Sequence, residues 1–200
     1  MKIITAPNPV LRQRAKKVTV FDKKFFKFLD ELANTLIKKE NPRGVGLAAP
    51  QVNKSMRVFA VILGEKNRDS KKPIVEFFIN PKITKYSDKK ILGLADGSER
   101  FEGCLSVPIL YGPVPRYEWI EIEYQNLTTL DLRSSSSMPK IKNIKNRFSD
   151  FDARVIQHEY DHLEGILFTD HILKSNLPVY IDENDTFVEV KDKKAILGLL

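Results

Sequence analysis

Hydrophobic residues between Asp22 and Lys39 recur every three or four positions, which is the spacing of one face of an α-helix. Asp22 is suited to cap the start of this helix, because its carboxylate can accept a backbone N–H of the first turn. The segment Asn41–Gly44 contains Pro42 and ends the pattern. The sequence therefore predicts an N-terminal helix over residues 22–39, with an apolar face made by Phe25, Phe26, Leu29, Leu32, Ala33, Leu36 and Ile37.

A second helical pattern lies between Ser149 and Gly165 and places two histidines on an apolar stripe. Ser149 or Asp150 can cap its start, and Gly165 can end it in the left-handed conformation. We therefore expect a helix that is buried on most sides. Its first stripe contains Phe151, Val155, His158 and His162 at positions i, i+4, i+7 and i+11, and its second contains Ile156, Tyr160 and Leu163.

Three segments between these helices are rich in β-branched and aromatic residues and are bounded by turns, so they are predicted strands. They are Arg57–Leu63, Ile74–Ile79 and Arg116–Tyr124. The polar stretches beside them are predicted to lie at the surface. We expect loops or hairpin tips at Gly64–Lys72 and Lys85–Arg100, and a flexible excursion that runs from Ser134 through the basic run Lys140–Arg147.

Strands that precede an isolated buried helix indicate an α+β fold rather than a regular alternation of strands and helices. We predict antiparallel β-sheets packed around a central α-helix, together with the N-terminal helix. The 200 residues, of which 42% are hydrophobic, are enough for one well-packed domain. We expect a single domain over residues 1–200, with a core at about 7–170 and a C-terminal extension over 171–200 whose structure the pattern leaves open.

The composition narrows the location and the partners. The chain has no run of 18 apolar residues and no signal-peptide or transit-peptide pattern at its start, so we expect a soluble, cytoplasmic protein. A single cysteine, Cys104, excludes an internal disulfide and fits a reducing compartment. The net charge of +7 and the pI near 9.3 favour acidic partners such as RNA, although lysine-rich solvated faces are the simpler explanation.

The stretch from His158 to His162, His-Glu-Tyr-Asp-His, carries the strongest chemical signal in the chain. Residues four apart lie on one side of a helix, so the two imidazoles could bind one metal ion with Glu159 beside them. Two buried imidazoles need partners, and a metal would supply them. The alternative is that the histidines are core residues hydrogen-bonded to the backbone, with Glu159 and Asp161 on a solvated edge. The prediction of metal-assisted hydrolysis therefore requires a third ligand elsewhere in the sequence.

Cys104 is the candidate third ligand, since a hydrolytic metal site has three protein ligands and one open position. It lies in the segment Glu102–Pro108, where Gly103 permits unusual backbone angles. The alternative is a buried, inert thiol. A further segment, Gly44–Gln51, has glycines that let the backbone approach a ligand, and it ends in an amide donor. Alone, that segment would be an ordinary loop.

Together, the segments around Gln51, Cys104 and His158 resemble the three signature motifs of the peptide deformylase family in residues, order and approximate spacing. The resemblance extends from about Pro7 to Phe168. It implies an enzyme that hydrolyses the formyl group from the N-terminal formyl-methionine of newly made proteins. It also implies a metal bound by Cys104, His158 and His162, Glu159 as general acid and base, an oxyanion site from the Leu105 N–H and the Gln51 amide, Gly46 lining the site through its backbone, and Arg116 paired with Glu102.

The resemblance further implies a cofactor and a pocket. One divalent ion, commonly Fe(II) in the family, would be bound, and a thiolate with two imidazoles also suits Zn(II), Ni(II) or Co(II). Such an ion can lower the pKa of bound water to roughly 7, and Glu159 can receive the proton. The pocket for the methionine side chain would include Gly44, Phe151 and Val155, although Phe151 and Val155 fit simple core packing equally well.

On the same resemblance, the partners are nascent formyl-Met polypeptides, and the basic runs Lys140–Arg147 and Lys191–Lys194 could contact ribosomal RNA. We expect no binding to DNA or to membranes. Two other functions stay open. A zinc endopeptidase would share the two-histidine helix but take a downstream third ligand, for which Glu164 and His171 are the nearby residues. A non-catalytic ribosome-binding metalloprotein would need a closed fourth position, which no second cysteine provides.

Overall fold

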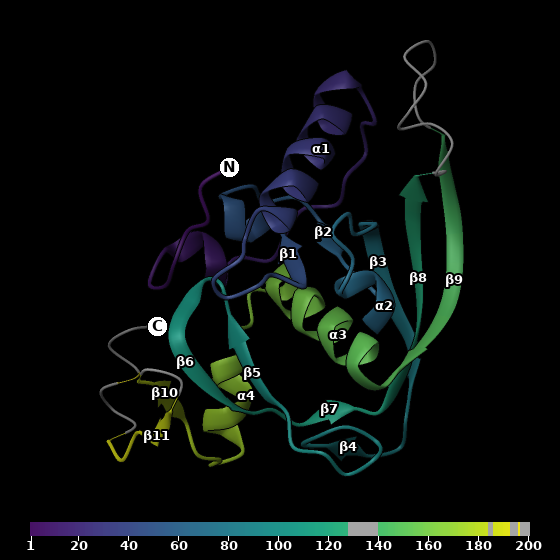
Figure 1. Cartoon of the computed structure of the whole chain (residues 1–200). Coiled ribbons are helices and arrows are strands. Elements are labelled where there is room, and N and C mark those ends of the chain that lie inside the picture. The colour runs from purple at the N-terminus through teal and green to yellow at the C-terminus, as the bar shows by residue number, and fades with distance from the viewer. Residues whose placement is uncertain (128–139, 184–185, 193–195, 197–200) are drawn as a thin grey trace.

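Figure 1 shows a computed structural model of the chain, in which one helix, α3, lies near the middle of the molecule among β-strands. The structure describes residues 1–127, 140–183, 186–192 and 196. The helices are α1 (Lys23–Ile37), α2 (Glu65–Arg68), α3 (Asp150–Glu164) and α4 (Phe168–Lys174), with two short 3-10 helices, η1 (Pro9–Arg12) and η2 (Ala49–Val52).

The larger sheet has five strands in the order β1-β2-β3-β8-β9, and every neighbouring pair is antiparallel. Its strands are β1 (Gly46–Ala48), β2 (Val58–Val61), β3 (Glu76–Tyr86), β8 (Trp119–Leu127) and β9 (Ile141–Ser149). Val58 and Ala60 pack in the apolar cluster with α1, whereas Phe59 and Val61 pack in the cluster with α3. Because both faces of β2 are covered, this strand appears in the sequence as a continuous apolar run.

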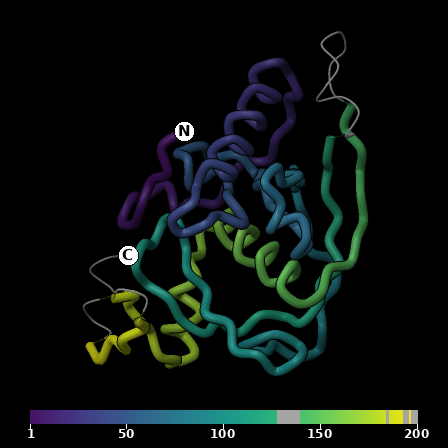
Figure 2. Tube along the Cα trace, in the orientation of Figure 1, coloured from purple at the N-terminus to yellow at the C-terminus, as the bar shows by residue number. Residues whose placement is uncertain are grey.

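The smaller sheet has four strands in the order β11-β10-β6-β5, again antiparallel. Its strands are β5 (Phe101–Cys104), β6 (Val107–Pro113), β10 (Tyr180–Asp182) and β11 (Phe187–Glu189), and a separate pair joins β4 (Lys90–Ile91) to β7 (Arg116–Tyr117). Helix α4 contacts β5 and β6. Figure 2 shows the chain passing from α3 through α4 to the yellow strands β10 and β11, of which β10 pairs with β6. Strands β10 and β11 therefore extend the sheet that holds Cys104.

Helix α3 links the two sheets. Its residues Ala153, Ile156 and Leu163 are fully buried and pack in one cluster with Phe59 and Phe78 of the larger sheet. On the other side, its histidines reach side chains of β5. The predicted α+β fold, with antiparallel sheets around a central helix, is confirmed.

The N-terminal helix is confirmed as well, and α1 occupies residues 23–37 of the predicted 22–39. It begins as expected, because Asp22 Oδ1 accepts a hydrogen bond from the backbone N–H of Phe25 at 2.9 Å. Within the described residues, no helix is both long enough and apolar enough to cross a membrane.

One prediction about the polar stretches is wrong. The basic run Lys140–Arg147 was expected to be a flexible excursion, but residues from Ile141 onward form β9, which pairs with β8 along its whole length. The apolar residues of β9 are Ile141, Ile144 and Phe148, a spacing that does not alternate and so hides the strand. Residues 134–139 of the predicted excursion lie outside the described residues.

Smaller corrections concern the lengths of elements. Strand β3 continues to Tyr86, well beyond the predicted end at Ile79, and a short helix, α2, occupies part of the predicted loop Gly64–Lys72. The predicted strand Arg116–Tyr124 is divided into β7 and β8, and β8 continues to Leu127. The stretch Lys85–Arg100 is largely exposed, as expected, but it contains β4.

Candidate metal centre and active site

Helix α3 brings His158, Glu159 and His162 to one place. It begins after Ser149 and ends at Gly165, whose φ of +74° is the left-handed conformation expected of a helix end. A Cβ at Gly165 would also lie 2.6 Å from the carbonyl oxygen of Arg12, so a larger residue does not fit at this position. The ring centroids of His158 and His162 are 5.1 Å apart, which places both imidazoles on the same side of the helix.

Strand β5 supplies the third potential ligand from the other sheet. Cys104 Sγ lies 3.2 Å from His162 Nε2, and one ligand atom from each of Cys104, His158 and His162 lies within 4.8 Å of the others. The pairing register of β5 and β6 shifts between Gly103 and Cys104. Such an irregularity re-aims a side chain, and here the cysteine points toward α3. Among the described residues, these three form the cluster whose donor atoms suit a metal ion.

The electrostatics of the three residues fit a bound cation. Burial alone would raise the pKa of Cys104, but the charges and hydrogen bonds of His162 and His158 outweigh it and hold the pKa well below its ordinary value. Burial would lower the pKa of His158, but Cys104 and Glu102 outweigh it and raise the pKa well above its ordinary value. These shifts favour the thiolate of Cys104 and the protonated, cationic form of His158. A divalent cation can take the place of that proton, so the residues fit a metal.

Glu102 is buried beside the cluster and is bound by three cationic side chains. Arg116 donates from Nε to Glu102 Oε1 at 3.0 Å and from Nη2 to Oε2 at 2.8 Å, which is the pair implied by the family resemblance. Arg154 Nη1 donates to Oε1 at 2.9 Å, and His158 Nδ1 lies 3.0 Å from Oε2. Burial would raise the pKa of Glu102, but Arg116 and His158 hold it well below the ordinary value. The carboxylate fixes the His158 ring and leaves Nε2 for the metal site.

Arg154 was not among the residues predicted from the sequence. Its guanidinium also donates to the backbone oxygens of Val114 at 2.8 Å, Gly93 at 2.8 Å and Ile91 at 3.1 Å, so it ties the β4 segment to the site. A signal was present in the sequence, because a charged residue within a helix predicted to be buried needs a buried counter-charge. The pattern gave no means of finding that counter-charge in β5.

Glu159 is the second buried carboxylate, with 4% of its surface exposed. Within the described part of the chain, its Oε2 has no hydrogen-bond partner. Burial raises the pKa of Glu159 to about 7, against the lowering effect of the two histidines. Gly46 faces the other oxygen, and a Cβ there would lie 2.4 Å from Glu159 Oε1. Only a glycine lets β1 approach this carboxylate so closely.

Gln51 lies in η2, where its side-chain oxygen accepts the backbone N–H of Ala48 at 2.8 Å. That bond turns the amide nitrogen toward the cluster, and Nε2 lies 3.6 Å from Cys104 Sγ. Gln51 is buried, with 1% of its surface exposed. Leu105 follows Cys104 in the chain and lines the same pocket.

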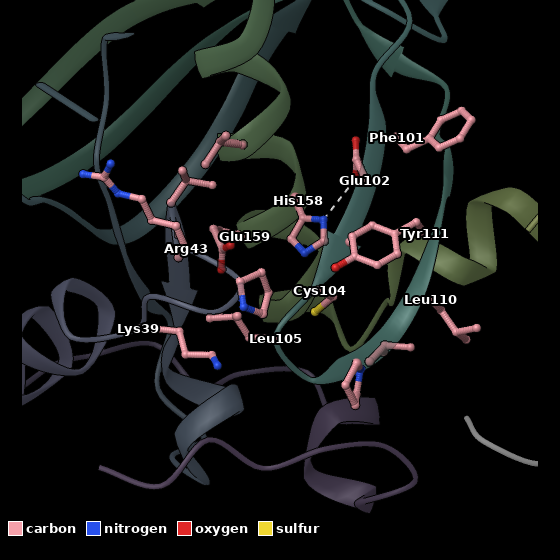
Figure 3. A pocket seen from close by; sticks show the side chains of 18 of the residues that line it. Lys39, Arg43, Phe101, Glu102, Cys104, Leu105, Leu110, Tyr111, His158 and Glu159 are labelled. Atoms are coloured by element: carbon pink, nitrogen blue, oxygen red, sulfur yellow. Dashed lines mark hydrogen bonds and ion pairs between the residues drawn. The ribbon is translucent and has the colours of Figure 1, made fainter. Parts of the chain in front are cut away.

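A pocket of about 520 Å³ opens over these residues and is shown in Figure 3. Gly44, Gly46, Phe151 and Val155 all line it, beside Cys104, His158 and Glu159. The ring of Phe151 is contacted by two guanidinium groups, and its centroid lies 4.5 Å from Cζ of Arg68 and 5.3 Å from Cζ of Arg100. The sequence gave no indication of three further lining residues, Phe101, Tyr111 and Asp182.

The residues that a zinc endopeptidase would need are engaged elsewhere. Glu164 is paired with Arg57 at 2.6 Å and with Arg14 at 2.8 Å. His171 Nε2 lies 2.8 Å from Asp161 Oδ2, and neither residue belongs to the described metal-ligand cluster. The third donor that accompanies the two histidines is therefore Cys104, which comes from upstream in the chain.

Comparison with known proteins agrees with this geometry. The sequence model of the family described as polypeptide deformylase matches residues 1–177. Peptide deformylase of Desulfotalea psychrophila is 36% identical over 179 residues, covering 88% of this chain and 91% of that protein, and peptide deformylase 1 of Bacillus subtilis is 36% identical over 173 residues, covering 86% and 90%.

Solved structures agree as well. The crystal structure of peptide deformylase from Thermotoga maritima superposes with a TM-score of 0.66 at 32% identity and covers 85% of this chain and 95% of that one. Peptide deformylase 1B of Arabidopsis thaliana, in complex with an inhibitor, gives a TM-score of 0.67 at 31% identity, with 88% and 85% covered. The family match, these relatives and the shared fold lead to one conclusion: the chain belongs to the polypeptide deformylase family, and it is a deformylase.

Proposed function

We propose that this enzyme removes the formyl group from the N-terminal formyl-methionine of newly synthesised polypeptides by metal-assisted hydrolysis, releasing formate. The observation that carries the proposal is the convergence, in one pocket, of Cys104, His158 and His162 with the buried carboxylate of Glu159. A site with three protein ligands is suited to activating water, because one position on the metal stays open, and the Glu159 Oε2 atom, which has no hydrogen-bond partner among the described residues, is free to take a proton.

Cys104, His158 and His162 would hold one divalent metal ion. Fe(II) is the first expectation from the family resemblance, and the same sulfur and nitrogen donors suit Zn(II), Ni(II) or Co(II). When bound, the ion would act as a Lewis acid toward the formyl carbonyl and the attacking water. Glu102 would keep His158 oriented through its Nδ1, and Arg116 would in turn hold Glu102.

Glu159 would move the proton. Its pKa of about 7 means that the carboxyl group can both accept a proton from water and return it near neutral pH. The atom that would do so is Oε2, which has no hydrogen-bond partner among the described residues. The proton would then pass to the leaving amine, which gives a free N-terminal methionine. Gly46 would keep β1 close against the same carboxylate, so the group is held in place as it titrates.

The oxyanion that develops from the formyl oxygen would be bound by the Gln51 amide and the Leu105 N–H. Gln51 is already oriented, because its side-chain oxygen accepts a hydrogen bond from the Ala48 N–H and its amide nitrogen faces Cys104. Donors of this kind commonly lower a barrier by about 3 kcal/mol each. The methionine side chain would enter the part of the pocket lined by Gly44, Phe151 and Val155, where apolar surface faces the opening.

Because the substrates are nascent chains, we propose that the reaction takes place in the cytoplasm. We propose one catalytic domain, with its core at about 7–170. We also propose that the enzyme works close to the ribosome. Strand β9 supports the last point, because it is the edge strand of the larger sheet and Lys142, Lys145 and Arg147 are exposed on it. Neutralising the two basic runs, Lys140–Arg147 and Lys191–Lys194, should reduce cosedimentation with ribosomes, and unchanged cosedimentation would remove this part of the proposal.

The central experiment measures formate release from formyl-Met peptides by protein purified without oxygen. Wild type should be active, and Glu159→Ala should lose at least about 100-fold in kcat while keeping its metal. Full activity in Glu159→Ala would overturn the mechanism. Cys104→Ser is the matched control for the ligand, because it should lose both metal content and activity, and a variant that kept both would remove Cys104 from the ligand set.

A further inference from the structure

One face of the smaller sheet is covered by aromatic rings. Strand alternation puts Phe101 and Gly103 of β5 on the same face, and the pairing register places Tyr111 of β6 opposite Gly103 and Tyr180 of β10 opposite Tyr111. Phe187 of β11 pairs with Asp182, two residues from Tyr180, and so shares that face. We call the four rings, Phe101, Tyr111, Tyr180 and Phe187, the aromatic face.

The rings of the aromatic face contact one another across four strands. Phe101 stacks on Tyr180 with centroids 4.7 Å apart, and Phe187 lies 5.5 Å from Phe101 and 5.1 Å from Tyr111. These are favourable aromatic distances. Phe187 is nevertheless 48% exposed, and the other three rings are half-buried. Strands β10 and β11 lie beyond residue 177, where the family match ends, so two of the four rings come from outside the matched region.

The aromatic face continues into the active-site pocket. Phe101, Gly103 and Tyr111 line the pocket together with Cys104 and His158. A Cβ added to Gly103 would lie 2.5 Å from Tyr111 Cε1, so the tyrosine ring covers the backbone directly before Cys104. Figure 3 shows Tyr111 beside His158, with Phe101 farther along the strand that carries Glu102 and Cys104. At about 520 Å³, the pocket is larger than a methionine side chain requires and has the size of sites for longer ligands.

We propose that the aromatic face binds the residues that follow formyl-methionine in the substrate and that it selects apolar side chains there. The inference rests on the proposed function and specifies its substrates. A peptide whose formyl group lies near Cys104 and His158 must pass other lining residues as it leaves the pocket, and these include Tyr111, Phe101 and the apolar Ile109, which is 56% exposed and which we take with the two rings as one rim. Exposed apolar groups beside a binding site favour an apolar partner.

The hairpin β10–β11 would act by supporting this rim. Phe187 packs against both Tyr111 and Phe101, although it does not line the pocket itself. Removing its ring would free the two lining rings to move and would expose a gap beside them. The expected consequence is weaker discrimination between substrates, with little change in the fold, because Phe187 is nearly half exposed.

The test compares two formyl tripeptides, one with apolar and one with polar residues after methionine, in wild type and in Phe187→Ala. Wild type should prefer the apolar peptide by about tenfold in kcat/KM, mainly through a lower KM, and Phe187→Ala should reduce that ratio to about twofold. The ratio is measured within each protein, so partial loss of active enzyme does not affect it. Tyr111→Ala should reduce the ratio as well.

Val188→Ala is the matched control, because Val188 is the neighbouring residue of the same strand, is 44% exposed and lies on the opposite face. Its kcat/KM values should equal those of wild type. A wild-type ratio near one, or a ratio that Phe187→Ala leaves unchanged, would overturn the inference while both peptides still release formate. If wild type releases formate from neither peptide, the proposed function itself fails.

Discussion

The molecule contains two buried carboxylates on either side of His158, and their surroundings differ completely. Glu102 and Glu159 are 7% and 4% exposed. Glu102 accepts hydrogen bonds from Arg116, Arg154 and His158, so both of its oxygens are occupied. Glu159 faces Gly46 with one oxygen, and its other oxygen has no partner within the described residues.

The difference separates a carboxylate that holds the site from one that can react in it. Burial pushes the pKa of both groups upward, but the cations around Glu102 hold its pKa well below the ordinary value, whereas the pKa of Glu159 rises to about 7. Glu102 therefore stays ionised near neutral pH and can act as a fixed anchor. Glu159 titrates near neutrality, which is what proton transfer requires.

Among the substitutions that test this contrast, Glu102→Gln should cause the largest loss of stability. The substitution keeps the shape of the side chain but removes the charged partner of Arg154 and leaves Arg116, also buried, with Asp161 as its remaining carboxylate. Removing one partner of a buried ion pair costs about 3–5 kcal/mol, so the free energy of unfolding in urea should fall by that amount at pH 7. A loss below about 1 kcal/mol would mean that the three cations do not depend on Glu102.

Glu159→Gln should raise the free energy of unfolding of the metal-free protein, whereas Glu102→Gln lowers it. The size of this gain should depend on pH. Because folding raises the pKa of Glu159 from 4.5 to about 7, its protonated form favours the folded state. Its contribution to stability is fully present below pH 4.5 and is lost as the pH rises through about 7. A shift of this size corresponds to roughly 3 kcal/mol, so metal-free Glu159→Gln should match wild type near pH 4.5 and exceed it by about that much near pH 8.5.

The measurement is a series of urea denaturation curves of the two metal-free proteins between pH 4.5 and 8.5. The titrations of Cys104 and His158 are present in both proteins, and to first order they cancel in the difference. If the two proteins show the same dependence on pH, burial does not raise the pKa of Glu159, and the contrast with Glu102 disappears.

Asp161 provides an intermediate case on the same helix. It is bonded to Arg116 and to His171, and although burial would raise its pKa, Arg116 outweighs that effect and lowers it. Because the folded-state pKa is lowered, the contribution of Asp161 is present above its ordinary pKa near 4 and is lost as the pH falls below it. Asp161→Asn should cost about 1–2 kcal/mol at pH 7 and progressively less in acid, measured by urea denaturation. A cost that grows as the pH falls would contradict this assignment.

The sequence predicted the two long helices, α1 and α3, better than the edges of the sheets. Helix α3 was predictable because its caps, its period and its two histidines agree along a continuous stretch. Strand β9 was not, because an edge strand with one contact face needs few apolar residues, and its lysines are typical of loops as well as of edges. The strand becomes evident only in its pairing with β8.

The same limit applies to the site. Glu102 and Arg116 could be paired only through family resemblance, and Arg154 and the rim residues Phe101 and Tyr111 were not predicted, since each acts through contacts between distant segments. Periodicity within one element says which residues face inward, but it does not say which element they will meet. The C-terminal hairpin, which carries Phe187, joins the sheet of Cys104 only through such a contact.

The smallest effect should come from Glu123→Gln, the same substitution at an exposed carboxylate. Glu123 pairs with Lys145 across β8 and β9 at 3.1 Å, and the two side chains are 49% and 56% exposed. Water and salt screen such a pair, so the free energy of unfolding should change by less than about 0.5 kcal/mol, and the change should vanish in 1 M salt. This variant gives the effect of a Glu→Gln substitution at the surface, against which Glu102→Gln and Glu159→Gln can be compared. If Glu123→Gln costs as much as Glu102→Gln, the loss at Glu102 reflects the amide substitution itself, and the buried cations cannot be its cause.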